Sequence, residues 1–427
     1  MNILKLSPYY YPENVSSSHL SKDLMDAYMA DSNINLKIYT PYPTRGITDE
    51  VRKDYIKNKK HEILNDGRVE IRRFPLFKEG KNSLLRAFRY ACSILMQLFC
   101  GLGAKDIDVL YIGSTPPING LMFPFFKWFK NFKIVYNLQD VFPDSLVNTG
   151  MTKKGSILFK IGAIVEKITY KYADKIVVIS EDFKKNIMDK GVPEEKIEIV
   201  YNWVDENAVV DVKREDNPLF DKYNLDREKF YICYSGNVGY TQNMEMLLDL
   251  AKEIEDNENI GFVIVGDGAF KPKLEELIIE KNIKNVTLIP FQDYKDISYV
   301  FSLGDMGLII SKKGVGTNSV PSKTWSVMSA KRPVLASFDK GSELDFIITE
   351  NNCGICVDAD DKETLKEAIL GCYENRESLY ILGENGRNYI LKNLTKETGT
   401  GSIINILRTA SGEKALKEAH EKTLIEK

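Results

Sequence analysis

Short apolar runs rich in Val, Ile and Tyr recur along the chain, and a stretch long enough for a helix follows each of them. In the first half they occupy residues 2–7, 36–40, 108–113, 133–138, 175–180 and 197–202. In the second half they occupy residues 230–236, 261–268, 285–290, 306–310 and 332–337. Nearly continuous apolar strands that alternate with helices are typical of parallel sheets covered on both faces. The pattern therefore predicts an α/β protein of the doubly wound type.

The strand pattern is interrupted between residues 206 and 220, where charged and turn residues accumulate. The length of 427 residues also exceeds one ordinary core. We therefore expect an N-terminal Rossmann-like domain over 1–205, a linker over 206–220, a C-terminal Rossmann-like domain over 221–390 and a helical tail over 391–427. The tail ends in a charged pattern that indicates a solvated helix. The carboxyl ends of both strand sets are expected to face a central cleft, where open α/β sheets bind ligands.

The composition is that of a folded globular protein, with 43% hydrophobic and 28% charged residues. The net charge of −3 comes from 58 basic and 61 acidic residues, so no global field attracts nucleic acid, and we expect no nucleic-acid partner. Six cysteines, with no secretory leader before the first strand, indicate reduced thiols and a cytoplasmic location. No window has the roughly 18 consecutive apolar residues of a membrane span.

Two glycine-containing loops follow strands of the second half. Gly236 and Gly239 lie between a strand and a helix start, which favours a phosphate-binding loop, although a tight turn without a ligand fits the same residues. Gly266 and Gly268 end another strand, and Lys271 lies just beyond them. Lys271 is a candidate for neutralising charge on a leaving phosphate, and the alternative is an ordinary surface lysine.

A second candidate for phosphate binding is a helix start. Pro321 and Ser322 open a predicted helix immediately before Lys323. Unpaired N–H groups together with an ammonium group would bind a diphosphate, whereas the alternative is a capped helix with a solvated lysine.

The first half supplies hydroxyl and carboxylate candidates after its strands. Ser17 lies in a Ser-Ser-Ser run at a helix start, beside His19, which we interpret as a helix-surface or packing residue rather than a base. Gln139 and Asp140 end the strand at 133–138. A carboxylate at this place accepts hydrogen bonds from sugar hydroxyls or assists proton transfer, unless it only caps the next turn.

These residues belong to an ordered series of motifs: SPYYYPENVSSSHL, QDVFPDSL, ADKIVVISEDF, VYNWVD, YSGNVGYTQN, VGDGAFK, VPSKTW and RPVLASFDKGSEL. The series resembles glycosyltransferase family 4 (GT4), a family of retaining enzymes, and is similar to its N-acetylfucosamine transferase branch in bacterial O-antigen and capsule synthesis. The resemblance implies a GT-B fold, whose first domain holds the acceptor and whose second domain holds the nucleotide sugar.

The resemblance also assigns residues. It places Gly236, Asn237 and Gly239 in the donor-phosphate loop, Lys323 in a Pro-Ser-Lys motif that continues to Thr324, and Glu343 near the nucleotide. From their places in the loops and helix starts described above, donor-binding candidates also include Ser17, Gly266, Gly268 and Ser322. Asp140, Lys323 and Lys271 are the predicted catalytic residues. The two glutamates that the family carries eight residues apart are replaced here by Asn318 and Ser326, which leaves ribose recognition unassigned.

The implied reaction is retaining transfer of a sugar, such as an N-acetylated deoxyhexose, from a nucleotide sugar linked to uridine diphosphate (UDP). The implied acceptor is a lipid-linked saccharide or another glycan. We expect no cofactor and no metal, since the Asp-x-Asp strings at 106–108 and 358–360 lack accompanying His or Glu. Two alternatives are a sugar-nucleotide epimerase, which needs paired acids and a histidine, and an inactive sugar-binding protein.

Two stretches of the first domain mix basic and large apolar residues. They are FPLFKEGKNSLLRAFRYACSILMQLFCGL, which contains Arg86 and Arg89, and LMFPFFKWFKNFK, which contains Trp128 and Phe129. Such mixtures suit the boundary between anionic headgroups and acyl chains, so we expect peripheral contact with the inner face of the cytoplasmic membrane. The alternative is that both helices only cover the sheet.

Overall fold

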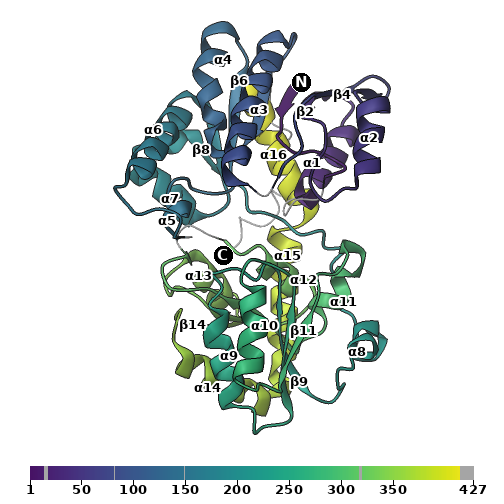
Figure 1. The fold of residues 1–427 in the computed structure, drawn as a ribbon, viewed down its shortest axis with the longest axis vertical. Coiled ribbons are helices and arrows are strands. Elements are labelled where there is room, and N and C mark those ends of the chain that lie inside the picture. Colours follow the sequence, from purple (N-terminus) through teal and green to yellow (C-terminus); the bar gives the residue numbers. More distant parts are fainter. Residues whose placement is uncertain (14–17, 81, 149, 317–319, 414–427) are drawn as a thin grey trace, which may run out of the picture.

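The computed structural model describes the chain except for residues 14–17, 81, 149, 317–319 and 414–427. The chain forms two α/β domains, one above the other in Figure 1, and each is built on its own sheet. Apart from one hairpin, every pair of neighbouring strands in the described residues is parallel. This confirms the predicted doubly wound α/β class.

The first sheet has the strand order β3-β4-β2-β1-β5-β6-β7-β8. Its strands are β1 (Asn2–Leu6), β2 (Asn35–Pro41), β3 (His61–Leu64), β4 (Val69–Phe74), β5 (Val109–Gly113), β6 (Lys133–Leu138), β7 (Lys175–Val178) and β8 (Ile197–Ile199). The sequence pattern did not reveal the antiparallel hairpin of β3 and β4, because charged residues interrupt its apolar positions. Arg73 of β4 is buried there and forms an ion pair with Glu62.

The second sheet has the order β11-β10-β9-β12-β13-β14. Its strands are β9 (Phe230–Ser235), β10 (Ile260–Val265), β11 (Val286–Ile289), β12 (Met306–Ile310), β13 (Val334–Ser337) and β14 (Gly354–Val357). Every residue of β10 and β12 is buried, as expected for parallel strands covered on both faces. β14 is short and begins with glycine, so it lacks the longer apolar run of its neighbours.

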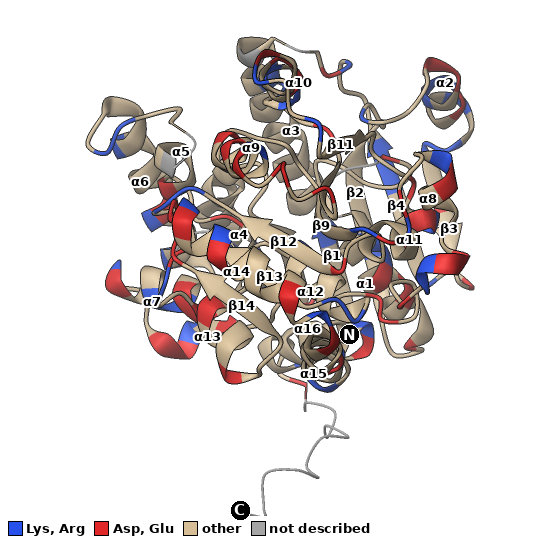
Figure 2. Ribbon diagram, turned by 90° about the horizontal axis from the view of Figure 1, so that it is seen from below, with Lys and Arg blue, Asp and Glu red and all other residues tan. Residues whose placement is uncertain are grey.

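Helices cover both sheets. In the first domain they are α1 (Ser18–Ala30), α2 (Asp49–Asn58), α3 (Ser83–Gly103), α4 (Phe123–Phe129), α5 (Asp144–Asn148), α6 (Ile157–Tyr172) and α7 (Glu181–Asp189). The later helices are α8 (Pro218–Lys222), α9 (Met244–Glu253), α10 (Lys271–Glu280), α11 (Ile297–Phe301), α12 (Lys323–Ser329), α13 (Glu343–Glu350), α14 (Lys362–Glu374), α15 (Leu379–Asn393) and α16 (Lys396–Ser411). Charged residues lie along α9, α13 and α14, whereas β12, β13 and β14 are free of them in Figure 2, so these helices bury apolar faces against the sheet.

The last described helix returns to the first domain, which the sequence did not predict. Figure 1 shows α16 in yellow beside α1 in the upper domain, whereas α15, which precedes it in the chain, belongs to the lower domain. Ile403, Ile404 and Leu407 of α16 are buried in the apolar layer that covers one face of the first sheet. The prediction of a solvated helical tail is therefore wrong for residues 396–411, whereas 414–427 lie outside the described residues. The charged pattern at the end of the sequence led to that prediction, and the apolar positions that precede it in α16 were overlooked.

Removal of apolar contacts from α16 should destabilise the first domain. Leu407 is fully buried, so we expect Leu407→Ala to lower the free energy of unfolding by about 2–5 kcal/mol through lost contacts and a cavity. Chemical denaturation followed by circular dichroism would measure the change. Leu391→Ala is the matched control, since Leu391 of α15 is 48% exposed. Equal stability of the two variants would show that α16 does not form part of this core.

Candidate active site

Two glycine loops follow adjacent strands of the second sheet and pack directly on each other. Gly236 follows β9 and Gly266 follows β10, with φ angles of +135° and +152° that side chains rarely adopt. The amide of Gly236 donates to the carbonyl of Val265 at 2.9 Å. A Cβ atom on Gly266 would lie 1.9 Å from the carbonyl oxygen of Gly236. These glycines are thus required for contact between the loops, whatever ligand the loops bind.

The remaining predicted loop residues differ in their access to a ligand. A Cβ atom on Gly268 would lie 2.3 Å from the carbonyl oxygen of Val238, so Gly268 also serves packing between the loops. Gly239 is buried, and its amide donates to the side-chain oxygen of Gln242 at 3.0 Å. Asn237 is exposed. Of these three predicted residues, Asn237 is the one that is accessible to a ligand.

Lys323 lies beside the first glycine loop, as the sequence predicted. Its Nζ atom donates to the hydroxyl of Tyr234 at 2.6 Å and would lie 3.0 Å from a Cβ atom on Gly236. The hydroxyl of Tyr234 in turn donates to the carbonyl of Asn237 at 2.5 Å. Burial lowers the pKa of Lys323 to about 7, because a desolvated amine favours its neutral form. A bound diphosphate would reverse that shift.

Tyr234 is the functional candidate that sequence reasoning missed. It is the last aromatic residue of β9 and is fully buried, so the pattern counted it only as an apolar strand position. Its ring lies under the Lys323 ammonium, with 3.8 Å between Nζ and the ring centroid. The tyrosine therefore positions the lysine at the loop by a hydrogen bond and a cation–π contact.

The other predicted residues of the second domain have different environments. Lys271, the first residue of α10, donates to the carbonyl of Gly266 at 3.3 Å and thus lies at the glycine loops. Ser322 is exposed next to Lys323. Thr324 is fully buried, and its hydroxyl donates to the carbonyl of Pro321 at 2.8 Å. The side chain of Thr324 thus stabilises the helix start, and its contact with the donor stays a prediction.

Glu343 lies at the junction of the two domains, where the sequence predicted a nucleotide contact. Its carboxylate accepts hydrogen bonds from the Tyr201 hydroxyl and, at 2.8 Å, from the Glu181 amide of α7. The amide of Glu343 donates to Asp182 at 2.9 Å. Burial raises the pKa of the Glu343 carboxyl group. One carboxylate oxygen thus holds α13 against α7, and the other holds it against Tyr201 after β8.

Two candidates lie near the start of α1. Ser17 falls outside the described residues, so its predicted donor contact stays a prediction. His19 stacks on Tyr294 of the second domain, with 6.2 Å between ring centroids. Burial lowers the pKa of His19. The structure thus confirms the interpretation of His19 as a packing residue.

A cavity of about 270 Å³ opens in the first domain at the carboxyl ends of β1, β5 and β6. Residues of α1 and α16 close its other side, including Leu24 and Ile403. Asp140 lines this cavity and is exposed to it, yet the surrounding protein removes enough water to raise the pKa of the carboxyl group. Its neighbour Gln139 is fixed by a hydrogen bond from Asn202 at 2.8 Å. The structure thus places Asp140 in the first domain, apart from the cluster of Gly236, Lys323 and Lys271.

The described residues contain no group of three His, Cys, Asp or Glu side chains that would hold a metal ion. Asp358 of the second Asp-x-Asp string pairs with Lys313 at 2.8 Å. Asp360 accepts a hydrogen bond from Asn243 at 2.6 Å. These carboxylates therefore have protein partners, and a reaction without a metal stays a prediction.

Two family models match the chain in succession. Residues 27–208 match the model for Glycosyltransferase Family 4, and residues 215–389 match the model for Glycosyl transferases group 1. The chain is 28% identical over 279 residues to the probable glycosyltransferase WbjE of Pseudomonas aeruginosa, covering 65% of this chain and 68% of that one. It is 26% identical over 282 residues to the putative colanic acid biosynthesis glycosyl transferase WcaI of Escherichia coli K12, with the same coverage.

A solved structure supports the fold. HepE of Anabaena, crystallised with UDP and glucose, matches 96% of this chain and 100% of its own with a TM-score of 0.71 at 14% identity. The comparison confirms the predicted GT-B arrangement of two Rossmann-like domains. The N-acetylfucosamine branch is not addressed by these relatives and stays a prediction.

The lowered pKa of Lys323 predicts proton uptake when a diphosphate binds. Because the pKa is about 7 in the free protein and an adjacent anion raises it, the amine should gain close to one proton on binding at about pH 8. The affinity should be highest below the free pKa and fall by at most about tenfold per pH unit above it. Calorimetry with UDP-glucose, in two buffers of different ionisation enthalpy, measures the uptake. Lys323→Met should abolish it, and a wild-type protein that binds without proton uptake would contradict the assignment.

Proposed function

We propose that this chain, which is a glycosyltransferase of the two-domain GT-B fold, transfers a sugar with retention of configuration from a UDP-linked donor to a lipid-linked saccharide. The observation that carries the proposal is the placement of Lys323, at the start of α12, against Tyr234 of β9 and Gly236 of the loop that follows β9. Sugar transfer from a nucleotide diphosphate leaves growing negative charge on the phosphate. A lysine and loop amides at this place stabilise that charge.

In this proposal, residues of the second domain act on the donor diphosphate and a residue of the first domain acts on the acceptor. Lys323 and Lys271 lie at the glycine loops, where they neutralise the leaving diphosphate. Asp140 lines the first-domain cavity, where a carboxylate orients an acceptor hydroxyl by accepting its hydrogen bond. The leaving phosphate then takes the proton from that hydroxyl on the same face of the sugar. We propose no metal and no cofactor in this step.

A relative supports the pathway, whereas the lipid-linked acceptor rests on the sequence resemblance. WcaI is described as a colanic acid biosynthesis enzyme, which supports a role in surface polysaccharide synthesis, with an O-antigen or capsule saccharide on a lipid carrier as acceptor. An N-acetylated deoxyhexose as the transferred sugar rests on the sequence resemblance. An epimerase, which needs paired acids and a histidine, is not favoured. Among the described residues Asp140 is the one acid that lines the cavity, and the ring of His19 packs on Tyr294.

Turnover of nucleotide sugars tests the proposal. The chain should hydrolyse one member of a panel of UDP-, GDP- and ADP-sugars slowly without acceptor, and equally well in EDTA. Lys323→Ala should weaken UDP binding by at least about 1.5 kcal/mol, the range of a charge-assisted hydrogen bond. Lys331→Ala is the matched control, because Lys331 follows the same helix but pairs with Glu384 at 2.7 Å.

Three outcomes would overturn parts of this assignment. No hydrolysis and no nucleotide binding would point to an inactive sugar-binding protein. Conversion of the sugar without its release would indicate an epimerase. Loss of all activity in EDTA, restored by Mg²⁺ or Mn²⁺, would contradict the reaction without a metal.

The first domain also presents an apolar face to solvent. Large side chains on three neighbouring helices are exposed, namely Leu84, Phe88 and Phe99 of α3, Trp128 and Phe129 of α4, and Ile157, Ile161 and Ile164 of α6. Several large apolar side chains exposed on neighbouring helices indicate an interaction site. In the described residues no helix has the length and apolar character needed to cross a membrane. We therefore propose that this face docks on an anionic membrane surface.

The basic residues of this face differ from those expected. Arg89 is fully buried and pairs with Glu79 at 3.6 Å, and Lys127 pairs with Asp174. The exposed lysines come instead from α6 and the turn before it: Lys153, Lys154, Lys160 and Lys167. Lysines at the edge of an apolar face contribute about 1 kcal/mol each near anionic lipid.

Vesicle binding tests the docking face. The double variant Trp128→Ser/Phe129→Ser should lose binding to vesicles of phosphatidylglycerol and phosphatidylcholine, because both side chains are 68% exposed and apolar. Tyr380→Ser/Ile381→Ser removes comparable exposed groups from α15 of the second domain and should bind normally. Cosedimentation at low and high salt measures both. Unchanged binding of the α4 variant would remove this face from the proposal and leave the transferase assignment intact.

A further inference from the structure

Lys5 is buried in the middle of the first sheet, where a charged side chain is unexpected. It lies on β1, between Ile38 of β2 and Tyr111 of β5 in the strand register, and is 9% exposed. Lysine is almost never buried to this degree unless it is paired. All other residues from Ile3 to Leu6 are buried and apolar.

The ammonium group of Lys5 has no hydrogen bond or ion pair to any residue that the structure describes. Its nearest recorded interaction is with the ring of Tyr10, at 5.9 Å from the centroid. The side chain lines the 270 Å³ cavity that also contains Asp140. Burial lowers the pKa of Lys5 to about 8, and no carboxylate offsets that shift. An unpaired amine therefore faces a cavity of ligand size.

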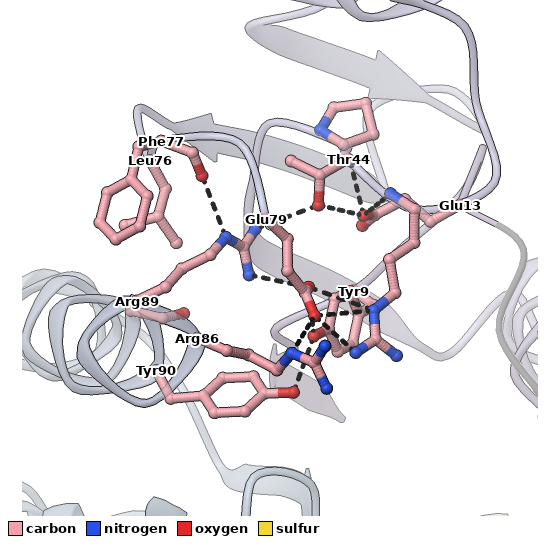
Figure 3. A network of polar contacts seen from close by, with 12 residues as sticks. Tyr9, Glu13, Thr44, Leu76, Phe77, Glu79, Arg86, Arg89 and Tyr90 are labelled. Atoms are coloured by element: carbon pink, nitrogen blue, oxygen red, sulfur yellow. Dashed lines mark hydrogen bonds and ion pairs between the residues drawn. The ribbon is translucent and has the colours of Figure 1, made fainter. Parts of the chain in front are cut away.

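The rim of the cavity carries further positive charge. Tyr9 and Arg45 line the cavity, and Arg45 binds Glu79 at 2.6 Å. Figure 3 shows that Arg86 and Arg89 also point at this single carboxylate, with 3.3 and 3.6 Å between charged atoms. One glutamate thus serves three guanidinium groups, and the cluster keeps an excess of positive charge.

The lining between Lys5 and the rim is polar. Ser114, Thr115 and Asn137 lie at the ends of β5 and β6 and face the same cavity. Hydroxyl and amide groups at these positions suit the hydroxyls of a saccharide. The cavity therefore combines sugar-binding groups with one deep, unpaired cation.

We propose that this cavity binds an acceptor that carries an anionic oxyacid group, a carboxylate or a phosphate, and that Lys5 is the receptor for that group. The inference rests on the proposed transferase function and specifies its acceptor. The anion supplies the partner that the buried amine lacks, and the charge-assisted hydrogen bond is stronger because the site excludes water. The carboxylate of an acidic sugar and the phosphate of a lipid carrier share this chemistry.

Binding of small acceptor analogues to the full chain tests the proposal. The donor site is first saturated with UDP, so that an anion added later does not bind at Lys323. Methyl glucuronide, phenyl phosphate and the neutral methyl glucoside are then titrated by calorimetry. The wild type should bind at least one charged analogue about tenfold more tightly than methyl glucoside, which corresponds to one charge-assisted contact. The better charged analogue identifies the source of the anion.

Two variants isolate the contribution of Lys5. Lys5→Met should lose the preference for the charged analogue and should fold, since an apolar side chain of similar length replaces a buried unpaired amine. A thermal midpoint equal to or above that of the wild type would verify folding. Lys37→Met is the matched control: Lys37 lies on the neighbouring strand β2 but donates to the Lys105 carbonyl at 2.9 Å, outside the cavity. It should keep the preference.

The outcomes separate this inference from the proposed function. Absence of UDP binding in the first step would contradict the transferase proposal. Normal UDP binding with equal affinity for charged and neutral analogues would overturn the anion site alone. If Lys5→Met keeps the preference, Lys5 is not the receptor. If the variant lowers kcat with an unchanged KM for the acceptor, the amine acts in the chemical step, which would also overturn the proposed role.

Discussion

The carboxylate of Asp23 holds together both places where the chain passes between its two domains. It accepts a hydrogen bond from the indole of Trp203 at 3.0 Å, on the first crossing, and pairs with Lys396 at 3.1 Å, on the second. The two crossings also lie side by side, since the Val204 amide donates to the Leu394 carbonyl at 3.1 Å. A buried carboxylate that lost these partners would leave an uncompensated charge, which is strongly destabilising. Asp23 therefore specifies where α16 leaves the second domain.

The position of α16 determines the shape of the acceptor side. The helix continues from Lys396 into the apolar layer under the first sheet, where Arg408 pairs with Asp31 at 2.5 Å. Ile403 of the same helix lines the first-domain cavity. The cavity is consequently made by residues from both ends of the chain. Its form depends on how the crossings are fixed, and Val200, Asn202 and Trp203 of the first crossing line it directly.

The sequence predicted those features that rest on local pattern. Continuous apolar strands such as β10 and β12 were recognised, because burial on both faces leaves a direct signature in composition. The hairpin of β3 and β4 and the docking of α16 were not, because both depend on partners distant in the chain. Arg73 and Glu62 are an example: the sequence alone indicates two surface residues, whereas the fold joins them in an ion pair.

The same distinction applies to the candidate site. Lys323 and Gly236 were predicted because loop and helix-start motifs mark the ends of parallel strands. Glu343 and Thr324 were assigned by their place in a motif, whereas hydrogen bonds to Tyr201 and to the backbone of Pro321 show how the fold uses them. Tyr234 and Lys5 were missed for the opposite reason. Each lies inside a buried strand, where the pattern is interpreted as core and the chemistry of one side chain has no signature.

Each domain thus contains one desolvated lysine at the carboxyl ends of its strands. Lys323 and Lys5 have pKa values lowered by burial to about 7 and about 8, respectively. Both lowered values show that burial disfavours the ammonium form at these places, where neither lysine has a carboxylate partner among the described residues. A built-in carboxylate would stabilise the charge, but it would also compete with an anionic ligand. Without a carboxylate partner in the described part of the protein, the amine finds its strongest partner in an anionic ligand. The free energy spent on burying the lysine is recovered only when an anion binds, and this makes the site selective for anions.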